Sequence, residues 1–211
     1  MNLVKIIRCK PIRCKRRLPV FIALLVSLCL VAASCTPKSE SIFEFTEFPF
    51  ADATYYAISK CHVRDEFMHI EIPATYNGLE VTYILYSAFE RCKMETVALS
   101  NVKQILTNAF AYCRTLKSID LGNVEYISDF AFGYCTSLES VEFPATLRHL
   151  GNGAFGACEK LREVYFWGNP RSLGENIFDA GVVIYGFPGG TVESYANTNG
   201  HTFVDISSIQ N

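Results

Sequence analysis

The sequence predicts a β-rich solenoid, in which successive turns of about 22 residues stack on one another. The five-residue motif Ala-Phe-x-x-Cys occurs four times, and its phenylalanines are 21, 22 and 23 residues apart. Soon after each motif comes a short run that ends in apolar–polar–apolar alternation, which is typical of a strand. A second apolar pair then precedes the next motif. Repetition at a nearly constant spacing indicates a repeat protein.

The interior of this solenoid is predicted from the motif itself. A single unit cannot bury its apolar face, whereas stacked units share a continuous core. The small alanine lets neighbouring turns approach closely, while phenylalanine and cysteine fill the inside as apolar residues. The predicted core residues are Phe89, Cys92, Phe110, Cys113, Phe132, Cys135, Phe155 and Cys158.

Residues 1–34 are predicted to be a secretory leader. A basic stretch, Met1–Arg17, is followed by an apolar run, Leu18–Ala33, and by small residues, which is the order of a signal peptide. Because Cys35 comes directly after the small residues, the leader resembles that of bacterial lipoproteins. The resemblance implies cleavage before Cys35 and lipid on its thiol. The alternative is an uncleaved membrane anchor, for which the apolar run is short.

Residues 35–52 are predicted to be the lipidated cysteine and a tether, with the acyl chains embedded in the membrane. The resemblance implies an outer-membrane lipoprotein of the bacterial cell envelope, because Thr36 stands where an aspartate would signal inner-membrane retention. Exposure on the cell surface stays open. Four phenylalanines are unusual in a free tether, and the alternative is that they pack on the first repeat beside a capping strand at Tyr55–Ile58. These residues are Phe43, Phe45, Phe48 and Phe50.

Residues 53–180 are predicted to hold the N-terminal cap and about five turns of repeats. The units resemble the BspA-type leucine-rich repeats of bacterial surface proteins, whose pattern is Leu-x-x-Val-x-Leu-Pro followed by Ile-x-x-x-Ala-Phe-x-x-Cys. Residues 142–158 match this pattern, and residues 72–82 resemble the opening unit. The resemblance covers Tyr55–Phe203 and implies a leucine-rich-repeat solenoid, a curved right-handed coil with a short strand in each repeat. Gly122 departs from the pattern by replacing the proline after the strand.

Residues 181–211 are predicted to close the array as a strand–turn–helix cap. The repeat pattern decays after Trp167, and no cysteine follows Phe178 although this residue keeps the phenylalanine slot. A strand at 182–185 precedes a glycine-rich turn and a short helix at 191–196, for which Thr191 is the predicted N-cap.

Composition and motifs restrict the function. The leader holds seven basic residues and no acidic one, so the rest of the chain has 12 Lys and Arg against 21 Asp and Glu. This acidity argues against a nucleic-acid partner. The four histidines stand in no catalytic arrangement, and no phosphate loop occurs, so we expect no enzyme and no cofactor. The repeated cysteines lie along a line rather than converging, which favours buried thiols over a metal site.

A ligand face is predicted where strand residues between two apolar anchors point outward. Acidic residues in neighbouring strands would form a stripe bordered by aromatic residues. The alternative is an ordinary solvated sheet face. The predicted ligand face consists of Asp120, Glu142, Glu163, Tyr165, Trp167 and Tyr126.

The leader, the array and the missing catalytic set predict a membrane-anchored, non-enzymatic binding module. The resemblance to BspA-type proteins implies an adhesin-like protein that binds host or partner proteins through the solenoid face. Aromatic rings beside polar groups also suit sugar stacking, so one alternative is a glycan-binding accessory lipoprotein. Another is a structural protein of the envelope.

Overall fold

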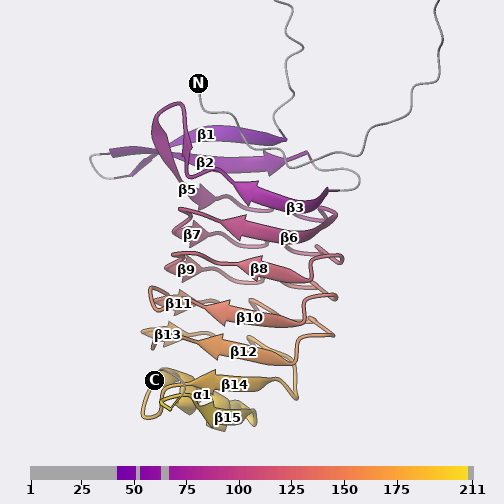
Figure 1. Cartoon of the computed structure of the whole chain (residues 1–211), viewed down its shortest axis with the longest axis vertical. Helices are drawn as coiled ribbons and strands as arrows, with labels where there is room; N and C mark the ends of the chain where they lie inside the picture. The colour runs from indigo at the N-terminus through magenta and orange to yellow at the C-terminus, as the bar shows by residue number, and fades with distance from the viewer. Residues whose placement is uncertain (1–41, 51–52, 63–66, 209–211) are drawn as a thin grey trace, which may run out of the picture. The chain divides into compact units, whose positions relative to one another are not determined.

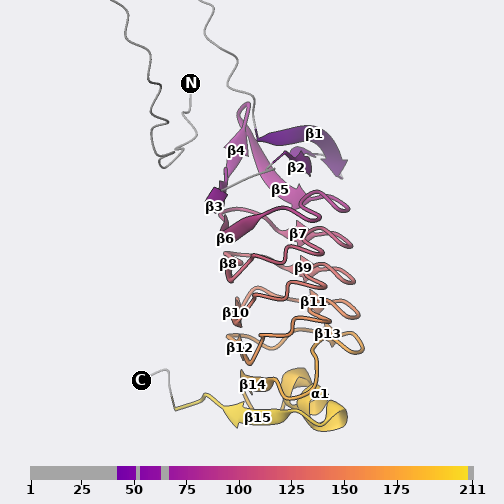
Figure 2. The same cartoon turned by 90° about the vertical axis from the view of Figure 1, so that its right-hand side faces the viewer.

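Two strands in each turn build a solenoid, which confirms the predicted fold class. The computed structural model describes residues 42–50, 53–62 and 67–208, and the turns number about six rather than five. Figures 1 and 2 show these turns stacked one above another, with longer strands along one side and shorter strands along another. The predicted signal peptide, Cys35 and the first part of the tether lie outside the described residues.

The longer strands, four of which follow the Ala-Phe-x-x-Cys motifs, pair in parallel as two separate sheets. The first sheet consists of β3 (Phe67–Ile72), β6 (Met94–Leu99) and β8 (Ser118–Asp120). The second sheet consists of β10 (Ser140–Phe143), β12 (Glu163–Phe166), β14 (Val183–Gly186) and β15 (Thr202–Asp205). Strands β8 and β10 are neighbours in the stack (Figure 1) but belong to different sheets. Side chains alternate between core and outside along these strands, as the apolar–polar pattern requires.

The shorter strands arise from the second apolar pair of each repeat, where the sequence predicted no strand. They are β7 (Gln104–Ile105), β9 (Tyr126–Ile127), β11 (His149–Leu150) and β13 (Ser172–Leu173). An eight-stranded sheet joins them to the N-terminal strands in the order β1-β2-β5-β7-β9-β11-β13, with β4 paired to β5. These N-terminal strands are β1 (Phe43–Phe50), β2 (Ala53–Cys61), β4 (Thr75–Tyr76) and β5 (Leu79–Ile84).

The repeated phenylalanines form a continuous stack through the core. Phe89, Phe110, Phe132 and Phe155 are fully buried, and successive ring centroids are 4.6, 5.0 and 4.9 Å apart. This spacing matches the distance of about 4.8 Å between neighbouring strands. Each turn therefore adds one ring to the core.

The repeated cysteines are buried thiols that satisfy backbone acceptors. Cys113, Cys135 and Cys158 each donate from Sγ to the carbonyl of the phenylalanine in the preceding turn, at 3.0, 3.3 and 3.3 Å. The hydrogen bond with Cys135, together with burial, raises the pKa of Cys113, and burial raises the pKa of Cys158. Cysteine fits this position because it is small and apolar and still carries a weak donor.

Backbone hydrogen bonds also link successive motifs. Tyr112 N–H donates to the carbonyl of Gly133 in the next turn, and Tyr134 N–H donates to the carbonyl of Gly156. At the equivalent position of the next turn, Ala157 N–H donates instead to the side chain of Asp179, at 3.0 Å from Oδ1. This column of N–H groups, from Tyr112 to Ala157, therefore ends on a side-chain carboxylate.

The N-terminal end of the stack is covered by a β-hairpin. Strands β1 and β2 pair antiparallel, although Phe43–Phe50 falls in the predicted tether. The buried ring of Phe43 lies 5.9 Å from that of Phe89, and Phe45 stacks on Tyr76 at 3.9 Å. The aromatic residues thus pack on the first turns.

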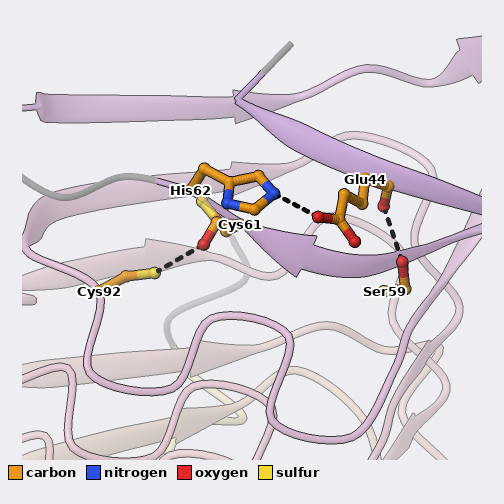
Figure 3. A network of polar contacts seen from close by, with 5 residues as sticks. All are labelled: Glu44, Ser59, Cys61, His62 and Cys92. Atoms are coloured by element: carbon orange, nitrogen blue, oxygen red, sulfur yellow. Dashed lines mark hydrogen bonds and ion pairs between the residues drawn. The ribbon is translucent and has the colours of Figure 1, made fainter. Parts of the chain in front are cut away.

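Polar contacts tie this hairpin together (Figure 3). His62 Nε2 lies 2.5 Å from Glu44 Oε1, and the Ser59 hydroxyl donates to the Glu44 carbonyl at 3.2 Å. Below them, Cys92 Sγ lies 3.9 Å from the carbonyl oxygen of Cys61. The side-chain hydrogen bond with Cys61 lowers the pKa of Cys92 against the opposing effect of burial.

The C-terminal end is covered by α1 (Thr191–Asn199) between β14 and β15. The prediction of Thr191 as N-cap is wrong: Gly190 is the N-cap, and the Thr191 hydroxyl lies 2.8 Å from Asn169 Oδ1 in the preceding turn. Gly200, with φ of 72°, ends the helix in the left-handed conformation. The phenol oxygen of Tyr195 accepts a hydrogen bond from Ile177 N–H, which ties α1 to the last turn.

In the part of the chain that the structure describes, no helix has the length and apolar character needed to cross a membrane.

Candidate functional site

The outward positions of the longer strands form two rows across the stack. In the first row, register pairs Glu71 with Ala98 and Ala98 with Asp120, and in the second sheet it pairs Glu142 with Tyr165 and Tyr165 with Tyr185. This row holds the residues between the apolar anchors. The neighbouring row is displaced by two residues along each strand and stays on the same side, since side chains alternate with a period of two.

Glu163 lies in the neighbouring row, so the predicted acidic stripe of Asp120, Glu142 and Glu163 does not form a single row. It pairs with Ser140 and Val183 rather than with Glu142. The carboxylate still reaches the first row, because it accepts hydrogen bonds from the hydroxyls of Tyr165 at 2.9 Å and Tyr185 at 3.4 Å. Burial, with the hydrogen bond and charge of Glu163, raises the pKa of Tyr165 to about 12. The phenol therefore stays a neutral donor at physiological pH.

Three aromatic rings lie near one another on this side. The rings of Tyr165 and Tyr185 stack at 4.4 Å with an interplanar angle of 11°, and Trp167 lies 6.5 Å from Tyr165 at 15°. Trp167 follows β12 directly, and its indole Nε1 donates to Glu142 Oε2 at 3.0 Å. Tyr165 therefore has one ring stacked on it and a second, more distant ring nearly parallel to it.

A depression opens where β8 and β10 are not paired. It has a volume of about 420 Å³ and is lined by Ser118, Asp120, Gly122, Ser140, Glu142 and Trp167, among others. We call it the acidic depression, because its lining includes two carboxylates and neither lysine nor arginine. A second depression nearby is lined instead by Lys160 and Arg162 together with Glu139 and Glu163, so its charges are balanced.

Gly122 shapes the acidic depression. Its φ is 51°, and a Cβ there would lie 2.4 Å from the carbonyl oxygen of Leu99 in the preceding turn. Its N–H donates to Asp120 Oδ1 at 2.9 Å, which fixes the carboxylate beside the depression. The departure from the proline of the repeat pattern thus has a local structural role.

Tyr126 lies apart from the other predicted ligand residues. It belongs to β9 in the sheet of shorter strands, where it pairs with Gln104 and His149. The structure brings together the other five predicted residues and adds Tyr185, which the sequence pattern assigned to the cap. The acidic–aromatic face is therefore defined as Asp120, Glu142, Glu163, Tyr165, Trp167 and Tyr185.

Tyr185 occupies a sequence position relative to Tyr165 which indicated that the two could be equivalent. It follows Tyr165 by 20 residues and lies in the middle of a strand pattern. Only the pairing of β12 with β14 fixes which residues stand opposite one another.

Within residues 42–50, 53–62 and 67–208, no group of three or more His, Cys, Asp or Glu side chains is arranged to hold a metal ion. Two histidines instead bond to hydroxyls in the next turn. His69 Nδ1 lies 2.6 Å from Thr96 Oγ1, and His149 Nδ1 lies 2.8 Å from Ser172 Oγ.

Comparison with known families shows to which family the repeats belong. The model of the BspA type leucine rich repeat region matches residues 58–182 in six copies. The chain belongs to the BspA-type leucine-rich repeat family. In this family the solenoid is typically a binding scaffold without enzymatic activity, and the family points to a protein-interaction or surface module.

Solved structures of bacterial leucine-rich repeat proteins resemble this BspA-type chain. A leucine-rich repeat protein of T. pallidum superposes with a TM-score of 0.61 and 26% identity over 69% of each chain. One from Bacteroides capillosus gives 0.51 and 27%, covering 59% of this chain and 94% of that one. The pneumococcal vaccine antigen PcpA, at 0.57 and 15%, covering 72% and 45%, shares the fold. None of the curated proteins matches this chain.

Proposed function

We propose that this chain is a membrane-anchored, non-enzymatic binding module, an adhesin-like lipoprotein of the bacterial outer membrane. Its partner is a protein that presents a basic side chain to the acidic–aromatic face. The leader and Cys35 support the anchor, and the family supports a binding scaffold. The observation that carries the choice of face is the acidic depression, where two carboxylates and an indole meet without a basic residue in the lining.

The chemistry of the depression favours a cation. Asp120 and Glu142 supply acceptors, while the indole of Trp167 can attract a guanidinium or ammonium group through its ring. A single exposed ion pair contributes only about 0–1 kcal/mol. Affinity therefore depends on burying the indole and the stem of the basic side chain at the centre of an interface, where aromatic residues are common hot spots.

A sugar platform on the acidic–aromatic face is less favoured. A sugar ring needs an uncovered aromatic face, whereas Tyr185 stacks on Tyr165 at 4.4 Å and Trp167 lies beside it. Its hydroxyl is also engaged by Glu163. The glycan alternative predicted from the sequence is therefore not supported at these residues.

Intrinsic fluorescence can test the proposal, because Trp167 is the only tryptophan of the chain. The purified full-length chain in detergent is titrated with host matrix proteins and with an arginine-rich peptide. We expect a change in Trp167 emission, and we expect the Asp120→Asn/Glu142→Gln variant to bind at least tenfold more weakly. The matched control is Glu139→Gln, in the charge-balanced depression, which should bind as the unchanged chain does.

Salt provides a second criterion. Charge-assisted binding at the surface should weaken as ionic strength rises. Absence of any protein ligand, or equal affinity of the double variant and the unchanged chain, would refute the proposed face.

A further inference from the structure

A left-handed backbone recurs at two positions around the phenylalanine of the repeats. One lies two residues before the phenylalanine, and the other lies two residues after it. The first column consists of Ser87, Asn108, Phe130, Gly153 and Asn176, with φ between 49° and 59°. The second consists of Arg91, Tyr112, Tyr134 and Ala157, with φ between 56° and 62°. We call the surface formed by these two columns the turn edge.

Phe130 is the exception in the first column. Glycine adopts positive φ at no steric cost, and asparagine does so at low cost, whereas a bulky side chain does so rarely. Phe130 has φ of 54°, and its ring is 50% exposed. Phenylalanine is thus unfavourable at this position for two reasons: the backbone is left-handed, and an apolar ring is exposed to water. Strain of this kind is a reason to look for a function.

The turn below makes room for the Phe130 ring. A Cβ on Gly153 would lie 2.5 Å from Cε1 of Phe130, so the ring rests directly against this glycine. The ring is therefore held in a fixed place on the surface rather than extending freely into solvent.

Tyr134, in the same turn, has one covered and one open ring face. It stacks on Tyr112 at 4.5 Å with an interplanar angle of 6°, and the Arg91 guanidinium lies 5.4 Å from the Tyr112 ring. The column then continues with Ala157, and no other ring of the described residues stacks on Tyr134. Tyr134 is 45% exposed. The stack of Arg91, Tyr112 and Tyr134 therefore ends on a partly exposed ring.

Two polar residues are chain neighbours of Phe130 and of the glycine beneath its ring. Asp129 precedes Phe130 and accepts a hydrogen bond from Asn152 N–H at 2.7 Å. Asn152 in turn accepts one from Glu175 N–H through Oδ1, at 2.8 Å. A carboxylate has a second oxygen and a carboxamide has an NH₂ group, so both side chains have further hydrogen-bonding capacity.

We propose that Phe130 and Tyr134 form a stacking platform for the neutral sugar rings of an oligosaccharide. A pyranose has an apolar C–H face that can cover an aromatic ring, and hydroxyls at its rim that can bond to Asp129 and Asn152. Two acidic residues adjoin the turn edge, because Asp179 accepts a hydrogen bond from Ala157 N–H and Glu175 directly precedes Asn176, and they disfavour an acidic sugar. This site is separate from the acidic–aromatic face and does not depend on the proposed protein partner.

The test uses the full-length chain in a detergent without a sugar headgroup. The probes are neutral tetrasaccharides of glucose, mannose, xylose and N-acetylglucosamine, with tetragalacturonate as the acidic comparison, and binding is measured by titration calorimetry. We expect a neutral probe to bind, and we expect Phe130→Asn and Tyr134→Asn each to lower the affinity at least tenfold. The matched control is Tyr86→Asn, which removes a ring that is 68% exposed two turns away and should leave binding unchanged.

Stability separates loss of a site from loss of the fold. Asparagine adopts positive φ more readily than phenylalanine, so Phe130→Asn should unfold at the same temperature or a higher one while it loses the sugar. The proposal is overturned if no neutral probe binds, if tetragalacturonate binds better, or if Phe130→Asn binds as the unchanged chain does. It is also overturned if the two variants lose a protein ligand instead, which would assign the turn edge to a protein partner.

Discussion

Gly122 lines the acidic depression with a backbone of positive φ, and its α-carbon lies against the preceding turn. We predict that Gly122→Ala destabilises the fold by more than about 1 kcal/mol, since left-handed strain of about 1–2 kcal/mol adds to a clash with the Leu99 carbonyl. Gly78 has φ of 83°, and a Cβ there would meet no heavy atom within 4 Å, so Gly78→Ala carries the strain alone. Denaturant unfolding of both variants measures the difference, and equal losses would contradict the clash.

The thiols offer a second prediction at the scale of single residues. Cys61 lowers the pKa of Cys92, whereas the pKa values of Cys113 and Cys158 are raised. At any pH below these values Cys92 has the larger thiolate fraction, and the thiolate is the reactive form. We expect N-ethylmaleimide to label Cys92 before the other two in the folded chain. Peptide mass spectrometry over time checks the order, and simultaneous labelling of all three would count against it.

At the scale of elements, the hairpin of β1 and β2 acts as the N-terminal cap. Phe43 is one of its core residues and is buried against Phe89 at the end of the ring stack. We predict that Phe43→Ala costs about 3–5 kcal/mol, the usual loss for removing a buried phenylalanine ring. Thr46→Ala, at an exposed position of the same strand, should change stability by less than about 0.5 kcal/mol. Thermal unfolding distinguishes the two, and a stable Phe43→Ala chain would show that the hairpin is dispensable.

Repetition explains which elements could be predicted from the sequence. The phenylalanines, the cysteines and the longer strands occur at the same offset in every unit, so each copy supports the others. Strands of two residues, such as β7, are too short for alternation to be recognised. Strand β15 depends on pairing with β14 across the intervening helix. Local patterns do not contain that information.

The candidate site was predictable only in part for a related reason. Alternation gives the side of the strand on which Glu142 and Glu163 lie, but not which turn-to-turn partner each faces. That depends on register, which placed Tyr185 beside Tyr165 and Glu163 beside Ser140. Tyr126 has the same alternation but belongs to the other sheet.

At the scale of the whole molecule, the proposed lipid anchor on Cys35 would determine where any binding takes place. We predict that Cys35→Ser moves the chain from the membrane fraction of a bacterial host to the soluble fraction or leaves it unprocessed, because the thiol that carries the lipid is gone. Cys29→Ser is the control, since it lies within the predicted leader and should leave anchoring intact. Cell fractionation and the mass of the N-terminal peptide provide the measurement. Retention of Cys35→Ser in the membrane with an intact leader would favour the uncleaved anchor.

The ladder of backbone hydrogen bonds has a consequence for how such a protein can change its length. Every internal turn offers donors on one side and acceptors on the other, so a duplicated internal turn would find its partners already in place. In the column of Tyr112 and Tyr134 the last position is different, because Ala157 N–H donates to the carboxylate of Asp179 and not to another main-chain carbonyl. A turn added beyond it would meet a surface that no longer repeats. We therefore expect duplication of an internal turn to be tolerated better than addition of a turn at the C-terminal end.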